Sequence, residues 1–170
     1  MNTKRELNKI ENITIPVLAL RGLVIFPGML LQFDVGRKKS ILALSKTMDE
    51  NQKIFLVAQK DLNDNEPTGN DLYKMGIVAK IKQVIRHSDG GIRLFAEGEY
   101  RAEITSIISE SPFIMANVCP AKSKTYTETH KTQALIRYTQ TLFEEYIQNY
   151  SRIPPDIIIG VVQKKDCGEL

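Results

Sequence analysis

The strongest constraint on the fold is an alternation of apolar and charged residues along two long segments. From Ile77 to Ile85 the odd positions are mostly apolar, and from Ile92 to Ile104 the even positions are apolar, with Gly98 as the one interruption. A period of two places the apolar side chains of a strand on one face. Asp89-Gly90-Gly91 lies between the segments and suits the positive φ values of a tight turn. The pattern predicts a long β-hairpin, and Gly98 predicts a bulge that bends its second strand.

The other segments before residue 120 are shorter. The spacing of Ile41, Leu44 and Met48 predicts an amphipathic helix over Arg37–Glu50. Asp61–Asn70 is rich in Asn, Asp, Pro and Gly, which predicts a surface loop. Apolar runs predict three further strands, at Met29–Val35, Lys53–Ala58 (buried on both faces) and Pro112–Val118. Together these elements predict a mainly β fold, a curled and mostly antiparallel sheet with one short helix.

The last fifty residues have a helical pattern. A polar linker begins at Ala121, and Thr125-x-x-Glu128 has the form of a capping box. Two apolar stripes follow at helical spacing, and Ile153-Pro154-Pro155-Asp156 predicts the start of another helix. The stripes are Leu135, Tyr138, Leu142, Tyr146 and Tyr150, and Ile136, Phe143 and Ile147. We expect three parts: a flexible N-terminus (1–12), a β subdomain (13–120) and the truncated start of a helical subdomain (121–170).

Composition and charge restrict the function classes. The net charge is only +3, the basic residues are scattered, and the chain has no Trp, which argues against a nucleic-acid-binding surface. No run reaches the roughly 18 apolar residues of a membrane span, and residues 1–12 lack the apolar stretch of a signal peptide. Cys119 and Cys167 are far apart, which is typical of free thiols. These features predict a cytoplasmic protein without a membrane partner.

The sequence predicts no chemistry in this chain. His87 and His130 lack a partner motif, no metal-binding spacing is present, and the Gly-x-x-x-x-Gly-Lys phosphate loop is absent. The charged residues that share one face of the second long strand are typical of a solvated sheet surface: Arg93, Glu97, Glu99, Arg101 and Glu103. We therefore expect no catalytic residues, no metal and no cofactor.

The segment Ile15–Met29 has two apolar extended stretches, broken by Pro16, Arg21-Gly22 and Pro27-Gly28. This pattern resembles the opening of the N-terminal domain of Lon, an ATP-dependent protease. Further segments resemble the same domain in the same order: Val35–Ser40, Ile54–Lys60, Asn70–Ala79, Ala96-Glu97-Gly98 with Tyr100-Arg101-Ala102, and Ile153–Asp156. The resemblance covers nearly the whole chain.

The resemblance implies a PUA-like pseudo-barrel over roughly residues 10–120. It implies a domain that recognises unfolded or damaged protein substrates and helps to assemble a hexamer. The ATPase module, which uses ATP and Mg, and the serine–lysine peptidase would lie in other parts of the longer protein, so this fragment is not an enzyme. Two alternatives are an RNA-binding PUA-like module and a stand-alone Lon-domain protein.

Candidate contact residues lie near the N-terminus. Between Leu23 and Phe33, eight of eleven residues are large and apolar, more than a strand buried on one face can hide. We therefore take Phe26, Met29 and Leu31, near the Pro27-Gly28 turn, as candidate substrate contacts. The first turn of the predicted helix carries Arg37, Lys38 and Lys39, and the resemblance allows a contact between subunits there.

Overall fold

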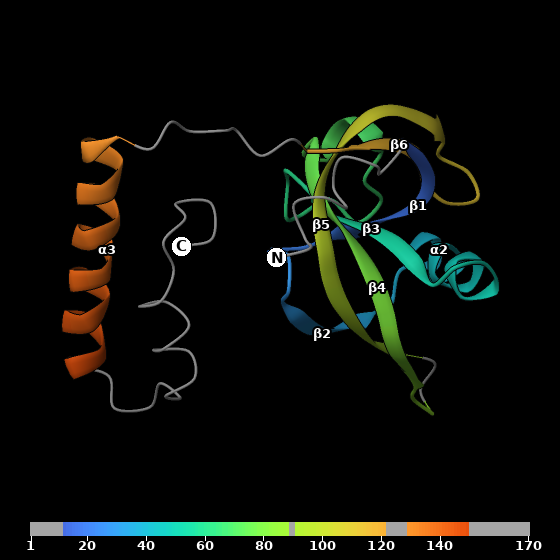
Figure 1. Cartoon of the computed structure of the whole chain (residues 1–170). Coiled ribbons are helices and arrows are strands. Elements are labelled where there is room, and N and C mark those ends of the chain that lie inside the picture. The colour runs from blue at the N-terminus through green and yellow to red at the C-terminus, as the bar shows by residue number, and fades with distance from the viewer. Residues whose placement is uncertain (1–11, 89–90, 122–128, 150–170) are drawn as a thin grey trace. The chain divides into compact units, whose positions relative to one another are not determined.

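The computed structural model describes residues 12–88, 91–121 and 129–149 (Figure 1). Its elements are β1 (Ile13–Leu20), β2 (Leu30–Val35), α2 (Lys38–Asp49), β3 (Lys53–Ala58), the 3-10 helix η2 (Gly69–Asp71), β4 (Met75–Arg86), β5 (Ile92–Ser109), β6 (Met115–Pro120) and α3 (His130–Asn149). The chain divides into two compact units after Ala121. We call the first the β unit. The mainly β fold with few helices is confirmed.

The six strands of the β unit form a sheet that closes on itself. Their order is β2-β5-β4-β3-β1-β6, and β5 also pairs with β6, which makes a ring of β1, β3, β4, β5 and β6. The 18-residue strand β5 makes this possible, because its first part pairs with β2 and its last part with β6. Figure 1 shows β4 and β5 as the long, curved strands of the barrel.

The sheet is mostly antiparallel, as predicted, and contains one parallel pair. β1 runs parallel to β3, with Val17 opposite Phe55 and Leu20 opposite Ala58, whereas the other strand pairs are antiparallel. A parallel pair needs a long crossover connection, and the segment that contains β2 and α2 provides it. The alternation of apolar residues along a strand does not indicate whether its neighbour runs parallel or antiparallel to it.

The core consists of two apolar clusters on either side of β3. Ile54 and Leu56 belong to one cluster, which includes Leu44 of α2, and Phe55 and Val57 belong to the other. All four β3 residues are almost completely buried, as the unbroken apolar run predicts. α2 lies against β1 and β3 and so covers the first cluster.

Several predicted elements have slightly different bounds. The last strand, expected at Pro112–Val118, begins three residues later at Met115, since Pro112 has no N–H to give to a ladder. The predicted bulge is confirmed: Val78 pairs with Tyr100 and Ala79 with Gly98, so β5 carries one extra residue. The turn residues Asp89 and Gly90 lie outside the described residues.

The second unit is described only through α3. The hydroxyl of Thr129 accepts a hydrogen bond from the backbone N–H of Thr132 and so caps the helix start. The side chains of the first predicted stripe from Leu135 to Tyr146 are exposed, and those of the second stripe are half-buried. The expected capping box at Thr125 and the helix after Ile153 lie outside the described residues. No helix in the described ranges combines the length and apolarity needed to cross a membrane.

Candidate functional site

The connection between β1 and β2 contains a tight turn at Phe26-Pro27-Gly28-Met29. The backbone N–H of Met29 donates to the carbonyl oxygen of Phe26 at 3.1 Å, and Gly28 has a φ of +78°. Proline before a residue with positive φ is typical of a type II turn, and glycine takes that φ without strain. The Pro-Gly pair therefore explains why the chain reverses here.

This turn is fixed on β5 at Gly98. The backbone N–H of Gly28 donates to the carbonyl oxygen of Gly98 at 2.8 Å, and the N–H of Gly98 donates to the carbonyl oxygen of Met29 at 2.9 Å. Two turn residues face one residue of β5, the arrangement of a β-bulge that begins with glycine. A Cβ atom at Gly98 would overlap the carbonyl oxygen of Phe26. Sequence alternation identified the bulge at Gly98 but not this contact with the turn.

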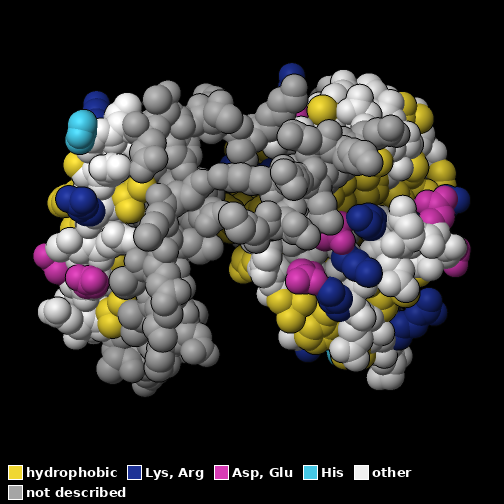
Figure 2. Space-filling view, in the orientation of Figure 1, with side chains coloured by type: hydrophobic (Ala, Val, Ile, Leu, Met, Phe, Trp, Pro, Cys, Tyr) yellow, Lys and Arg dark blue, Asp and Glu magenta, His cyan; other side chains and the backbone are white. Residues whose placement is uncertain are grey.

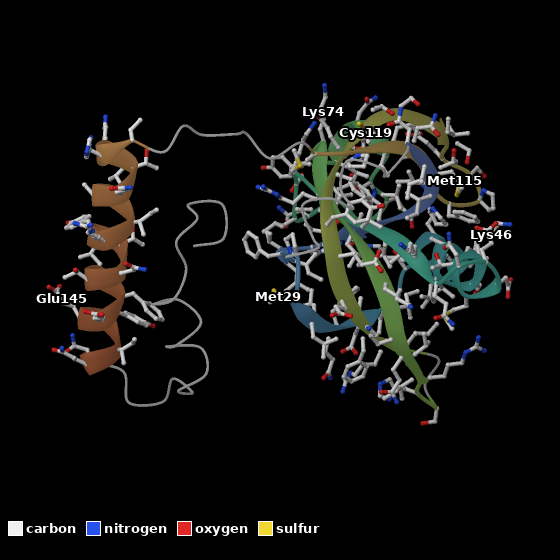
Figure 3. All side chains as sticks on the ribbon, in the orientation of Figure 1. Met29, Lys46, Lys74, Met115, Cys119 and Glu145 are labelled. Carbon is white, nitrogen blue, oxygen red and sulfur yellow. The ribbon has the colours of Figure 1, made fainter. Side chains whose placement is uncertain are left out.

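Around the turn lies a group of exposed apolar side chains, which we call the apolar turn surface. It consists of Leu23, Val24, Phe26, Met29 and Leu30, with exposed fractions from 37% to 63%. Met29 projects from the margin of the β unit (Figure 3). Within the same segment only Ile25 and Phe33 are buried, so they anchor it in the core.

The three candidate substrate contacts therefore have different environments. Phe26 and Met29 belong to the apolar turn surface. Leu31 is half-buried and packs against the core cluster that contains Phe33, whereas its neighbour Leu30 is 62% exposed. Sequence reasoning missed Leu30, although alternation with the buried Phe33 would have placed it on the outer face.

The basic cluster at the start of α2 is partly engaged within the chain. Arg37 precedes the first helical turn, and its Nη2 donates to Oε1 of Gln59 at 2.7 Å. Gln59 is buried, and its Nε2 donates to the backbone oxygens of Asp61 and Asp64. Burial, followed by the nearby charge of Arg21, lowers the pKa of the Arg37 guanidinium. Arg37 thus ties α2 to the loop that follows β3.

Of the two lysines that follow Arg37, one forms an ion pair within the chain and the other is exposed. Lys39 forms an ion pair with Glu66 at 3.5 Å, and Lys38 is exposed. The first turn of α2 has no acidic residue and no side-chain cap. The role of the three basic residues in subunit contact stays a prediction.

A pocket of about 310 Å³ lies between β1, β2 and the start of α2. Its walls include the apolar residues Leu20, Leu23 and Phe33 and the charged residues Arg21, Asp34 and Arg37. Arg21 Nη2 donates to Oδ1 of Asn65 at 2.7 Å and thereby holds the loop at the pocket's rim. Leu23 lines the pocket and also belongs to the apolar turn surface, so the two adjoin each other.

Several charged groups elsewhere on the β unit form ion pairs with their neighbours. Lys82 contacts Glu97 at 2.5 Å, and Lys53 contacts Glu99 at 2.7 Å. On β2, the carboxylate of Asp34 accepts two hydrogen bonds from Arg93, which lower its pKa. Acidic and basic side chains are interspersed with apolar ones on the visible face (Figure 2). Among the described residues, no three His, Cys, Asp or Glu side chains gather as metal ligands would.

The fold places the chain among small, mainly β-barrel domains that are followed in sequence by a helical segment. Residues 14–170 match the model of the ATP-dependent protease La (LON) substrate-binding domain, and the chain belongs to this family. The chain is 36% identical over 157 residues to the Lon protease of Desulforamulus reducens, and the aligned region covers 92% of this chain and 19% of that protein. It is 38% identical over 170 residues to the Lon protease of Escherichia coli K12, and the aligned region covers 100% of this chain and 21% of that protein.

Two solved structures have a similar fold. The N-terminal domain of Mycobacterium avium complex Lon protease has a TM-score of 0.66 and 21% identity, over 91% of this chain and 77% of that one. The Lon N-terminal domain protein from Xanthomonas campestris has a TM-score of 0.55 and 11% identity, over 91% of this chain and 92% of that one. The chain spans about a fifth of the length of its Lon protease relatives.

Proposed function

We propose that this chain is the substrate-recognition part of an ATP-dependent serine protease, and that it captures unfolded or damaged proteins on its apolar turn surface. The observation that carries the proposal is the exposure of Phe26, Met29 and Leu30 on a turn that is fixed to β5. Exposed apolar patches on soluble domains commonly mark interaction sites. The name of the family model, a substrate-binding domain, supports the same role.

One copy of this surface would bind only weakly. Burying about 300–600 Å² of apolar area contributes roughly 7–15 kcal/mol at about 25 cal/mol per Å². Loss of translational and rotational freedom costs about 4–15 kcal/mol and offsets most of this gain. In a ring of six subunits, several linked copies would hold one unfolded chain more tightly without any new contact. Weak single contacts also allow a substrate to be released for its transfer to the ATPase and peptidase modules.

The double variant Phe26→Ser, Met29→Ser is expected to bind an unfolded protein at least about tenfold more weakly, a change of about 1.4 kcal/mol. Reduced and carboxymethylated lactalbumin, labelled with a fluorophore, is a suitable probe, and anisotropy measures its affinity for this chain. Both side chains are exposed, so the thermal unfolding temperature should change little.

Ile108→Ser provides the matched control, because Ile108 is an equally exposed apolar residue on β5 outside the apolar turn surface. Its affinity for the probe should equal that of the unchanged chain. Equal loss in both variants would show that general surface hydrophobicity, and not the turn, retains the probe. Full binding by the double variant would place recognition elsewhere.

We also propose that Lys38 contributes to a contact between subunits. It is exposed at a helix N-terminus, where a cation opposes the helix dipole and gives the helix no local benefit. In the longer hexameric protein, Lys38→Glu is expected to lower the hexamer fraction in sedimentation velocity at low protein concentration. An unchanged hexamer fraction would exclude this contact, and unchanged thermal unfolding would confirm that the helix is intact.

A further inference from the structure

β2 is an edge strand that lacks the usual protection. In the part of the chain that the structure describes, it lies at the end of the strand order and pairs only with β5, outside the closed ring. Proteins commonly shield such edges with proline, lysine, bulges or very short strands. The six residues of β2 contain no proline and no lysine, and their single charge, Asp34, is held by Arg93 of the neighbouring strand. The edge is therefore available for pairing with another extended chain.

The hydrogen bonds at Gly98 show which backbone groups point outward. The N–H of Gly98 donates to Met29, and pairing continues without a shift from Leu30 opposite Glu97 to Val35 opposite Ile92. In an antiparallel ladder, alternate residues bond to the partner strand. The backbone N–H and C=O groups of Leu31, Phe33 and Val35 therefore bond to β5. Those of Leu30, Gln32 and Asp34 point to the free edge. Among the described residues, no backbone hydrogen bond from another segment reaches these outward groups.

The free edge of β2 faces a second unpaired edge across the 310 Å³ pocket. β6 pairs with β1 only over Ile13–Pro16, and beyond this the N–H of Val17 reaches Ile114. Within the described ranges, no strand pairs with the last part of β1 on that side, and its residues line the pocket together with Phe33–Val35 of β2. The barrel is thus closed by β6 in one half and open between β1 and β2 in the other.

We propose that an extended segment of a protein substrate adds to the outer edge of β2 as a further strand. This inference rests on the proposed function and specifies how the same surface binds. Strand addition obtains its affinity from backbone hydrogen bonds and its selectivity from pockets for alternate side chains. One end of the added strand would lie at the apolar turn surface, and the other would enter the pocket between β1 and β2.

The pocket restricts the sequence of such a segment. Its lining combines apolar residues with Arg21 and Arg37, and its one acidic residue, Asp34, is paired with Arg93 outside the pocket lining. The segment should therefore be apolar at alternate positions and carry a neutral or acidic residue, but not lysine or arginine, where it enters the pocket. The pocket volume lies at the lower end of the range for ligand sites, which suits one or two side chains of the bound segment.

Gln32→Pro tests the proposal, because it removes one outward N–H and leaves the ladder between β2 and β5 intact. Affinity for the carboxymethylated lactalbumin probe is expected to fall about fivefold or more. Gln32→Thr is the matched control, since it changes the side chain but keeps the N–H, and its affinity should stay within about twofold. Thermal unfolding reports whether either variant is intact.

Amide hydrogen exchange of the unchanged chain gives a readout that does not depend on a variant. Saturating probe is expected to slow exchange at Leu30, Gln32 and Asp34 at least tenfold, and to affect Leu31 and Phe33 little. Binding without this alternation, or full binding by a folded Gln32→Pro variant, would overturn strand addition while the proposed function stands. Absence of any binding by the unchanged chain would overturn both. Slowed exchange at high chain concentration without probe would instead show pairing between two copies.

Discussion

Replacing Phe55 by alanine is expected to lower the free energy of unfolding of the β unit by about 3–5 kcal/mol. The Phe55 ring is completely buried in the cluster around Val57 and Val78. It also fills the space above Gly76, where a Cβ atom would lie 2.5 Å from its Cζ. The substitution therefore leaves a cavity that a closed barrel cannot easily collapse. Urea denaturation followed by circular dichroism measures the change as a shift in midpoint at constant slope.

Phe26→Ala is the matched control, because it makes the same chemical change at a side chain that is 63% exposed. Surface substitutions of this kind usually change stability by no more than about 0.5 kcal/mol. A loss at Phe26 comparable to that at Phe55 would mean that the apolar turn surface is part of the packed interior. A small loss at Phe55 would contradict the described core.

Gly98→Ala is expected to destabilise the β unit by about 1–3 kcal/mol, the usual range for overpacking. The new Cβ would overlap the carbonyl oxygen of Phe26, which is backbone and cannot rotate away. The turn would have to leave β5, which weakens the hydrogen bonds between Gly98 and the backbone groups of Gly28 and Met29. We therefore expect a lower urea midpoint and weaker binding of the unfolded probe in the same variant.

Gly36→Ala is the control for Gly98→Ala. A Cβ atom at Gly36 would meet nothing within 4 Å, and its φ is not in the left-handed region. This variant should keep the urea midpoint. If Gly98→Ala behaves in the same way, the turn does not depend on its close contact with β5.

Local patterns predicted most of the strands. Lys53–Ala58 is found with the predicted bounds, because a short unbroken apolar run allows few alternatives. The long alternating segments became β4 and β5, although both extend beyond the predicted ends, to Arg86 and Ser109. Pairing between distant strands was not predictable in this way. The parallel pairing of β1 with β3 and the closure by β5 and β6 depend on the path of the whole chain.

The candidate site was predictable only in part. The number of apolar residues between Leu23 and Phe33 indicated that some must be exposed, and the Pro-Gly pair located the turn. Which residues are exposed depends on the register with β5, which places Leu31 toward the core and Leu30 outward. The free edge of β2 and the pocket beside β1 have no local sequence signal, because both depend on which short parts of β1 and β5 pair with β6.

The pairing of the first strand with the last also determines when this domain can fold during its synthesis on the ribosome. Thr14 of β1 hydrogen-bonds to Asn117 of β6, which is 103 residues further along the chain. At 5–20 residues per second, about 5–20 s pass between the synthesis of the two strands. Throughout this time β1 is a nascent apolar strand without its partner from β6. A translational pause before residue 120 would therefore prolong the period in which nascent-chain chaperones, and not the native barrel, cover this strand.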